Sequence, residues 1–276
     1  MKAIVTGANS CMGKATVAAL ADKGYEVTML CRDEKRGNDA YNELMRENSN
    51  RNIKLMLCDL GNYSSIRAFV EQYILMNESL DLLINNAGFI SLDRQFTDEG
   101  VERQFGINHL GHFLLTNLLV PYMPKDSRIV VVASGAHKAG EIHFDDISLT
   151  KGYNVVKAYG QSKLANVLFT REMARRLEEN RITVNCCHPG AVATNMGVSR
   201  DTGFGKTITG MLKPFFLTPE EGARTALYLA TSNEVSKISG EYFYKCKKAK
   251  SSDLSKDMEL AKRLYDLSAK MTGLNS

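Results

Sequence analysis

"TGANSCMG", residues 6–13, stands between an apolar run and a helical pattern. The run "KAIVT" (2–6) predicts a strand, and the pattern over 13–23 predicts a helix with one apolar side. A glycine-rich link from the carboxyl end of a strand to the start of a helix offers backbone N–H groups and the helix dipole to a phosphate. The same pattern can also be a plain tight turn, so the surrounding sequence has to decide between the two.

The alternation of strand and helix continues along the whole chain, and it predicts a doubly wound α/β fold. Most of the strand runs are continuously apolar, as in a parallel sheet of about seven strands with helices on both faces. We expect a single domain over 1–276, with a cofactor half at about 1–135 and a catalytic and substrate half at about 136–276. The further strands are predicted at 26–30, 53–57, 81–85, 128–133, 182–186 and 241–245, and the further helices at 34–47, 63–77, 99–121, 155–179, 219–231 and 253–271.

Composition and charge exclude several classes of protein. The net charge of +4 is mild and the basic run "KCKKAK" (245–250) is short, so we expect no nucleic-acid partner. No apolar run approaches the roughly 20 residues of a membrane span, and "MKAIVTG" leads directly into a strand, so no integral membrane segment is expected. The six cysteines show no CxxC spacing, which indicates reduced thiols in a cytoplasmic protein.

The end of the second strand predicts which dinucleotide is bound. A site that prefers NAD places an acidic side chain there for the ribose 2′-hydroxyl, whereas this chain has Cys31 followed by Arg32. A guanidinium suits a 2′-phosphate, and Lys35 or Arg36 could add charge. The alternative is a surface arginine paired with Asp33. We therefore predict NADP(H) as the preferred cofactor, with NAD(H) as the second choice.

A candidate catalytic group follows the strand at 128–133. Ser134 ends that strand, and Tyr159 and Lys163 stand four residues apart in "YGQSK", on one face of the predicted helix. A tyrosine needs help to act as a base at neutral pH, and a nearby ammonium would stabilise its phenolate. Alone, such a pair is usually an ordinary surface pair, but together with Ser134 and the phosphate loop it predicts acid–base chemistry on a substrate oxygen.

These motifs together resemble the short-chain dehydrogenase/reductase family over almost the whole chain. "TGANSCMG" matches the family's TGxxxGxG, "NNAG" (85–88) its NNAG, "YGQSK" its YxxxK and Pro189–Gly190 its PG. The resemblance implies a Rossmann-type fold and a catalytic tetrad of Asn108, Ser134, Tyr159 and Lys163, in which Asn108 anchors a water relay to the lysine. It implies cofactor contacts from Gly7, Asn9, Ser10, Cys11, Met12, Gly13, Arg32, Asp59, Leu60, Asn86, Ala87, Gly88, Tyr159, Lys163, Pro189, Gly190, Val192 and Thr194.

Within that family the chain looks like the retinol dehydrogenase-like branch. "INHLGHFLLTNLL" and "YGQSKLANVLF" carry this likeness. The branch implies NADP(H) and a lipophilic carbonyl or alcohol as the small-molecule partner. The family's subunits commonly pair through the helices that correspond to 99–121 and 155–179, so the resemblance is compatible with a homodimer or homotetramer.

Cys11 is the main departure, since it replaces the middle glycine of the loop. A Cβ there adds bulk beside the pyrophosphate path, at little cost if the backbone is helical. It is the one feature that favours a rival hypothesis, a dinucleotide-sensing or scaffold protein without turnover. A sugar epimerase is a weaker alternative, because little chain is left after Lys163 for a substrate domain.

Two further features leave alternatives open. The five histidines lack the spacing of metal ligands, so we expect no metal site and structural or pocket-edge roles, with His137 as the best candidate for a substrate contact. The stretch "MLKPFFL" (211–217) is either a lid over an apolar substrate or a membrane-surface contact, and the lid ranks first.

Overall fold

One mainly parallel sheet organises the computed structural model, which describes residues 1–48, 51–76, 79–190 and 217–274. The strand order is β3-β2-β1-β4-β5-β6-β7-β8, and only the pairing of β7 with β8 is antiparallel. The two-residue β8 is the strand that the sequence did not predict. The bounds are β1 Lys2–Thr6, β2 Glu26–Cys31, β3 Ile53–Leu57, β4 Leu82–Asn85, β5 Arg128–Val132, β6 Thr183–His188, β7 Tyr242–Tyr244 and β8 Lys247–Lys248.

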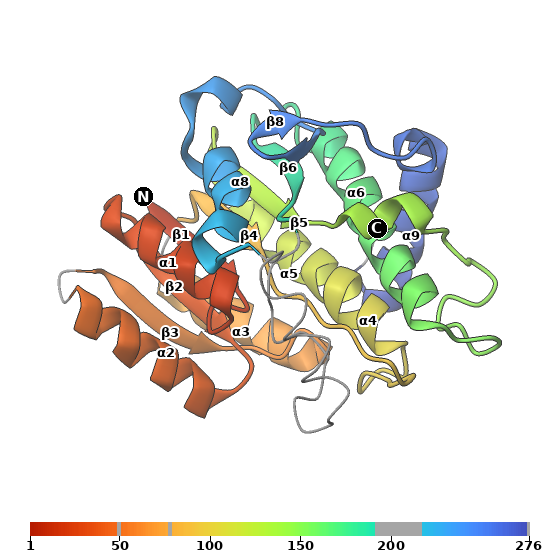
Figure 1. The fold of residues 1–276 in the computed structure, drawn as a ribbon, viewed down its shortest axis with the longest axis horizontal. Coiled ribbons are helices and arrows are strands. Elements are labelled where there is room, and N and C mark those ends of the chain that lie inside the picture. The colour runs from red at the N-terminus through yellow and green to blue at the C-terminus, as the bar shows by residue number, and fades with distance from the viewer. Residues whose placement is uncertain (49–50, 77–78, 191–216, 275–276) are drawn as a thin grey trace.

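Helices cover both faces of the sheet (Figure 1). On one face lie α1 (Cys11–Asp22), α2 (Glu34–Glu47) and α8 (Pro219–Thr231); on the other lie α3 (Tyr63–Leu75), α5 (His112–Leu119) and α6 (Val155–Arg176). The last helix, α9 (Met258–Thr272), packs outside this layer against α6. The predicted α/β architecture with two helical layers is confirmed.

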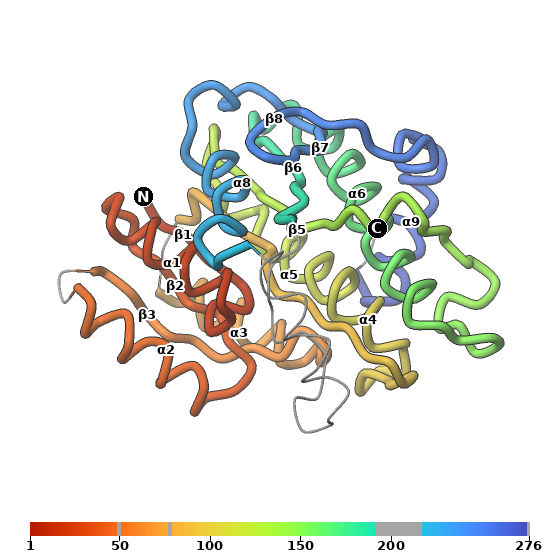
Figure 2. The backbone as a smooth tube through the Cα atoms, in the orientation of Figure 1, coloured from red at the N-terminus to blue at the C-terminus, as the bar shows by residue number. Residues whose placement is uncertain are grey.

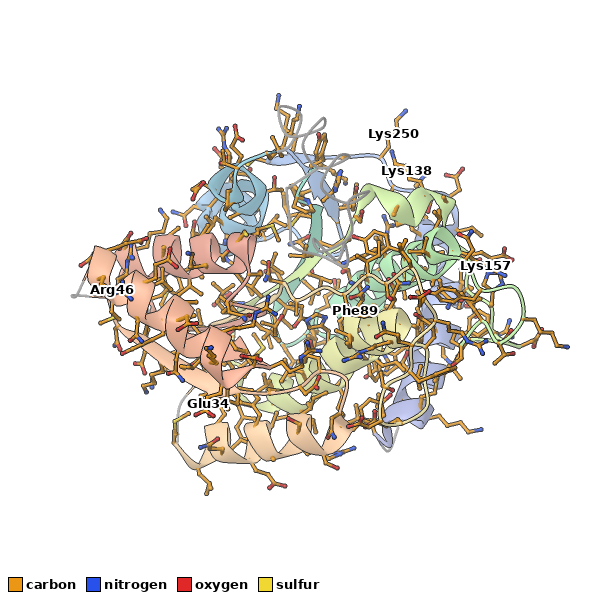
Figure 3. The ribbon with its side chains drawn as sticks, turned by 60° about the horizontal axis from the view of Figure 1, so that its bottom comes forward. Glu34, Arg46, Phe89, Lys138, Lys157 and Lys250 are labelled. Carbon is orange, nitrogen blue, oxygen red and sulfur yellow. The ribbon has the colours of Figure 1, made fainter. Side chains whose placement is uncertain are left out.

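The core explains why the strands read as continuous apolar runs. Successive residues of one strand enter opposite layers: Ile4 packs with the α3, α5 and α6 side, while Ala3 and Val5 pack with the α1, α2 and α8 side. Both kinds of residue are fully buried, because helices exclude water from both faces of the sheet. Figure 3 shows the side chains around this core: the charged Arg46 lies at the rim of the view, and Phe89 lies near its middle.

The predicted helix over 99–121 is interrupted in the structure. It starts at α4 (Arg103–Phe105), because the Glu102 carboxylate accepts hydrogen bonds from the backbone N–H of Gln104 and Phe105. It then widens into a π-helical turn, η1 (Gly106–Gly111), continues as α5 and closes with a 3₁₀ turn, η2 (Val120–Tyr122). Most helix caps lie at the surface, but Glu102 is buried. The start of this helix therefore depends on tertiary packing.

The predicted helix over 253–271 also starts later than expected. Residues Leu254–Lys256 form a 3₁₀ turn (η6), and α9 begins after Asp257, whose side chain accepts from the Leu260 N–H at 2.9 Å. Over the described residues, the other 3₁₀ turns are η3 (Gly135–Ala139) and η5 (Asn233–Val235).

The sheet order places a crevice at the carboxyl ends of its central strands. β1 lies between β2 and β4, so the chain winds in opposite directions from this point. Such a switch point in a doubly wound sheet is where ligands bind. Residues at or just after the carboxyl ends of β1, β2, β4 and β5 line one cavity there. Figure 2 traces the chain through these four strands.

Candidate active site

A cavity of about 550 Å³ opens at the switch point and is built from both halves of the chain. Most of the residues predicted to hold a cofactor or to act in catalysis line it. These are Gly7, Asn9, Ser10, Cys11, Met12, Arg32, Asp59, Leu60, Asn86, Ala87, Gly88, Ser134, Tyr159, Lys163, Pro189 and Gly190. Val192, Thr194 and residues 211–216 lie outside the described residues; Leu217 packs beside Gly190.

The loop after β1 needs glycine at two places. Gly7 has a φ of 62°, and a Cβ on it would lie 2.9 Å from the Cα of Ala87. A Cβ on Gly13 would collide with the carbonyl of Gly7 and lie 2.8 Å from Asn86 Nδ2. Gly13 does not line the cavity. It supports the site by letting the loop pack closely on the neighbouring strand end.

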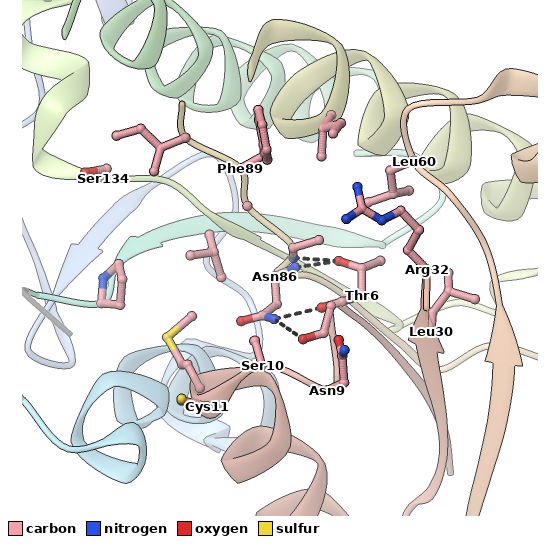
Figure 4. Close-up of a pocket in the computed structure, with 18 of the residues that line it drawn as sticks. Thr6, Asn9, Ser10, Cys11, Leu30, Arg32, Leu60, Asn86, Phe89 and Ser134 are labelled. Carbon is pink, nitrogen blue, oxygen red and sulfur yellow. Dashed lines mark hydrogen bonds between the residues drawn. The ribbon is translucent and has the colours of Figure 1, made fainter. Parts of the chain in front are cut away.

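Cys11 is the first residue of α1. Ser10 caps that helix by accepting a hydrogen bond from the Gly13 N–H at 3.3 Å. The backbone at Cys11 is helical, so the cysteine needs no glycine-like conformation. Cys11 is half-buried and nevertheless lines the cavity (Figure 4). The loop is thus unstrained, and the Cβ and Sγ of Cys11 take up space at its inner side.

Thr6 and Asn86 tie together the floor of the cavity (Figure 4). The Thr6 hydroxyl accepts from the backbone N–H of Asn86 at 2.9 Å and of Ala87 at 2.8 Å. The Asn86 amide in turn donates to the Thr6 carbonyl at 2.7 Å. Asn86 Oδ1 is buried and has no hydrogen-bond partner among the described residues, so the floor presents an acceptor to whatever occupies the cavity.

Arginines line the cavity beyond β2. Arg32 follows the strand, and Arg36 lies one turn into α2. The Asp33 carboxylate caps α2 by accepting from the Arg36 N–H at 2.8 Å. Both guanidinium groups are exposed to solvent, and they give this end of the cavity positive charge.

Asp59 and Leu60 line the same end of the cavity, as the resemblance implied. The Asp59 carboxylate accepts from the Gly61 N–H at 2.9 Å, which fixes the turn after β3.

The predicted acid–base residues come together at the other end. Tyr159 and Lys163 lie on α6, and Ser134 precedes η3, with its hydroxyl accepting from the Ala136 N–H at 3.2 Å. The Lys163 ammonium donates to the Val132 carbonyl at 3.0 Å and lies 5.6 Å from the centroid of the Tyr159 ring. Four-residue spacing on α6 thus does bring the phenol and the ammonium to one wall of the cavity.

Burial dominates the titration of these two groups. It lowers the pKa of Lys163 to about 8, so the lysine is mostly protonated at neutral pH. Burial raises the pKa of Tyr159 above its ordinary value, and a hydrogen bond from Ser134 acts in the opposite direction. The four-residue spacing from Lys163 suggested a lowered pKa for Tyr159, whereas burial in this structure raises it. The phenol therefore carries its proton at neutral pH.

Asn108 supports the site from behind and does not line the cavity. It is buried in η1, where its side chain accepts from the Phe89 N–H at 2.7 Å and donates to the Phe89 carbonyl at 2.9 Å. It also donates to the Ser162 hydroxyl at 3.0 Å, next to Lys163. Phe89 lines the cavity, so Asn108 holds one wall and connects it to α6. Its expected role in a water relay stays a prediction.

Sequence reasoning missed a set of apolar and small residues. They adjoin the motifs: Phe89 and Ile90 follow "NNAG", and Cys58 precedes Asp59. Position beside a strand end is the signal that could have found them. The missed lining residues are Thr6, Leu30, Asp33, Cys58, Phe89, Ile90, Ile107, Val132 and Ala133.

His137 was the wrong candidate for a substrate contact. It is fully buried, and its ring lies 4.7 Å from that of Tyr242. Its Nε2 accepts from the Ser252 N–H at 3.2 Å, so its Nδ1–H donates to the Ser134 carbonyl, 2.6 Å away. Both ring nitrogens are occupied by backbone groups, and the residue is structural.

The described residues form neither a cluster of metal ligands nor a helix that could span a membrane. In the part of the chain that the structure describes, no three His, Cys, Asp or Glu side chains gather as metal ligands would. None of the helices over the described ranges has the length and apolar character that crossing a bilayer requires.

Known sequences are similar to this chain over almost its whole length. The model of the short chain dehydrogenase family matches residues 1–203. Human retinol dehydrogenase 14 is 42% identical over an alignment of 294 residues, gaps included. The alignment covers 98% of this chain and 86% of that protein. Human retinol dehydrogenase 13 is 42% identical over 282 residues, covering 99% and 85% respectively.

Solved structures give the same result for the fold. An uncharacterized protein from Mycobacterium paratuberculosis superposes with a TM-score of 0.80 at 32% identity, covering 99% of this chain and 93% of that one. A blue fluorescent protein from a metagenomic library, solved in complex with NADPH, has a TM-score of 0.69 at 25% identity and covers 88% and 94%.

Proposed function

We propose, because this chain belongs to the short chain dehydrogenase family, that it transfers a hydride between NADP(H) and a carbonyl or alcohol group of a lipophilic small molecule. The family match and the retinol dehydrogenase relatives make it an oxidoreductase that acts on alcohol or carbonyl groups. The cofactor preference, the role of Tyr159 and the substrate are our proposals. One observation carries them: a glycine-containing loop, a pair of arginines, the half-buried Tyr159 and the buried Lys163 share a single cavity.

The cavity fits a dinucleotide phosphate along its length. Gly7 and Ser10 would receive the pyrophosphate at the start of α1, where backbone N–H groups and the helix dipole favour anions. The unpartnered Asn86 Oδ1 would accept a hydrogen bond from the bound molecule. Asp59 and Leu60 would flank the adenine.

The arginines favour NADP(H) over NAD(H). A guanidinium forms charge-assisted, two-pronged hydrogen bonds with phosphate. Arg32 directly follows Cys31, which stands at the strand end where a NAD-preferring site has an acid. Asp33, the nearest carboxylate, is engaged as the cap of α2. NAD(H) could still bind through the remaining contacts, with lower affinity.

In the proposed reaction the protein positions the substrate oxygen and moves one proton. NADPH, held in this cavity, would supply the hydride that the carbonyl carbon receives. Tyr159 then donates its hydroxyl proton to the developing alkoxide, which is a stronger base than the phenolate that remains. Ser134 donates a hydrogen bond to the same oxygen, and the Lys163 ammonium stabilises the phenolate left behind.

A lipophilic substrate suits the apolar residues that line the cavity. Phe89, Ile90 and Ile107 line it. The relatives named retinol dehydrogenases point to the same class of substrate. Whether the compartment is the cytoplasm stays a prediction from the sequence, in line with six free cysteines.

The cofactor proposal is tested by titrating the protein with NADPH and NADH. We expect NADPH to bind about ten- to a hundredfold more tightly, the value of a charge-assisted contact of about 1.5–3 kcal/mol. Arg32→Ala should shrink this ratio, while the control Arg46→Ala, an exposed arginine on α2 away from the cavity, should leave it unchanged. Equal affinities for the two nucleotides in the native protein would refute the preference.

A further inference from the structure

His112 joins the two sides of the site without lining the cavity. It is the first residue of α5, directly after the π-helical turn, and is 1% exposed. Its Nε2 lies 2.9 Å from the Thr6 hydroxyl and its Nδ1 lies 3.1 Å from the Asn108 carbonyl. One ring therefore bridges the end of β1 and the turn that carries Asn108.

The hydrogen-bond partners of the Thr6 hydroxyl determine which group donates in each of the two bonds of His112. The Thr6 oxygen already accepts from the N–H groups of Asn86 and Ala87, which uses both of its lone pairs. Its own hydrogen must be donated, and His112 Nε2 at 2.9 Å is nearer than the Ile84 carbonyl at 3.4 Å. Nε2 is then the acceptor, so Nδ1–H donates to Asn108.

The ring is neutral in this arrangement. Burial lowers the pKa of His112 to about 4, and the neighbouring Lys163 ammonium acts in the same direction. A neutral ring with one donor and one acceptor is the only form that satisfies Thr6 and the Asn108 carbonyl together.

Thr6 transmits this bond to the cofactor side. Its hydroxyl holds the Asn86 and Ala87 peptide groups, which line the floor of the cavity below the phosphate loop (Figure 4). The position of Ala87 matters there, because Gly7 packs against it so closely that a Cβ on Gly7 would lie 2.9 Å from the Cα of Ala87. A rotated Thr6 hydroxyl would release this floor.

We propose that His112 is a positioning residue for the cofactor: it orients the Thr6 hydroxyl and so fixes the Asn86–Ala87 floor against the phosphate loop. The inference rests on the proposed function, because it assigns His112 to the binding of a nicotinamide dinucleotide. Its bond to the Asn108 carbonyl sets the ring's own orientation, as a second hydrogen bond commonly does for a functional histidine.

A histidine that merely fills the core is the competing explanation, and the chain offers a matched control. His109 lies three residues earlier and is also 1% exposed. Burial likewise keeps its pKa low, at about 3. Its Nε2 bonds the Ser268 hydroxyl on α9, 2.9 Å away and on the side opposite to the sheet. Replacing either ring disturbs the same helical stretch, but only His112 contacts Thr6.

The test compares NADPH affinity, read from the fluorescence of the reduced nicotinamide, in His112→Phe and His109→Phe. Both variants should unfold at a lower temperature. His112→Phe should raise the NADPH dissociation constant about tenfold, since a buried hydroxyl loses its acceptor, whereas His109→Phe should change it less than about twofold. Equal effects of the two substitutions on affinity would overturn the proposal.

A second pair of variants covers a His112→Phe protein that fails to fold. Glutamine at 112 reaches far enough to accept from Thr6, whereas asparagine reaches only the Asn108 carbonyl. His112→Gln should therefore bind NADPH within about threefold of the native protein and His112→Asn about tenfold more weakly. Asparagine binding as tightly as glutamine contradicts the proposal. If the native protein binds neither NADPH nor NADH, the proposed function itself falls; if it binds but these variants match it, only the role of His112 falls.

Discussion

At the scale of single residues, the sequence motifs could be identified because the members of each motif lie close together in the chain. Tyr159 and Lys163 could be paired from four-residue periodicity, and Gly7 from the turn that it makes. Thr6 and His112 could not be found in this way. They act through a hydrogen bond between residues 106 positions apart, which only the folded chain brings together.

Cys11 tests how closely the phosphate loop approaches its ligand. Cys11→Gly should tighten NADPH binding, because it removes the Cβ and Sγ from the cavity wall. It should also cost up to about 0.5–1 kcal/mol of stability without cofactor, since glycine has more backbone entropy to lose in a helix. Melting curves with and without NADPH separate the two effects. Cys11→Ser, which keeps a Cβ, is the control, and an identical NADPH-induced shift in the glycine variant would show that Cys11 does not crowd the site.

Lys163 sets the pH dependence of reduction. Its pKa in the free protein is about 8, so kcat/KM should be level near neutral pH and fall as the pH rises above about 8 and the ammonium loses its proton. The raised pKa of Tyr159 places its own titration at a higher pH. Lys163→Arg keeps a charge at every working pH and, despite lower activity, should move the fall upward by at least about one pH unit. An unmoved alkaline limb in the arginine variant would assign it to another group.

At the scale of elements, periodicity predicted the helices but not where they begin or what they cover. The helix predicted from 99 starts at Arg103 because the buried Glu102 caps it, and its π-helical turn leaves no trace in the spacing of apolar residues. The two-residue β8 is too short to carry a pattern. These features are decided by tertiary contacts.

α9 covers the helices through which subunits of this family were expected to pair. Its Tyr265 ring lies 4.9 Å from that of Phe113 on α5, and its hydroxyl donates to Asn117 at 2.7 Å. Arg176 of α6 lies 3.6 Å over the same ring. A dimer or tetramer built on α5 and α6 would require α9 to move away.

We therefore expect a monomer in sedimentation at micromolar concentration, or an assembly through another face. Tyr265→Ala should destabilise the protein by about 2 kcal/mol, through lost ring packing and a lost hydrogen bond, and should promote self-association. Lys262→Ala, an exposed position on the same helix, should change stability by less than about 0.5 kcal/mol. Cross-links between α5 or α6 of two native subunits would contradict this role of α9.

At the scale of the whole molecule, the order of the strands makes the site. Alternating strands and helices predict a parallel sheet, and a switch point follows from the winding of its two halves. The phosphate loop and arginines come from residues before 135, whereas Tyr159 and Lys163 come after it, and one cavity receives both. The segment 191–216, which includes most of the predicted lid, lies outside the described residues.

The central claim is that Tyr159 protonates a substrate oxygen beside NADPH in this cavity. The direct measurement is NADPH oxidation, followed by absorbance of the reduced nicotinamide with a panel of lipophilic aldehydes and ketones, in the native protein and in Tyr159→Phe. We predict turnover of at least one compound by the native protein. The variant should bind NADPH within about threefold of native affinity and lose about 10²–10⁴-fold in kcat, the range of a general acid. Near-native turnover of the same compound by Tyr159→Phe would contradict the account.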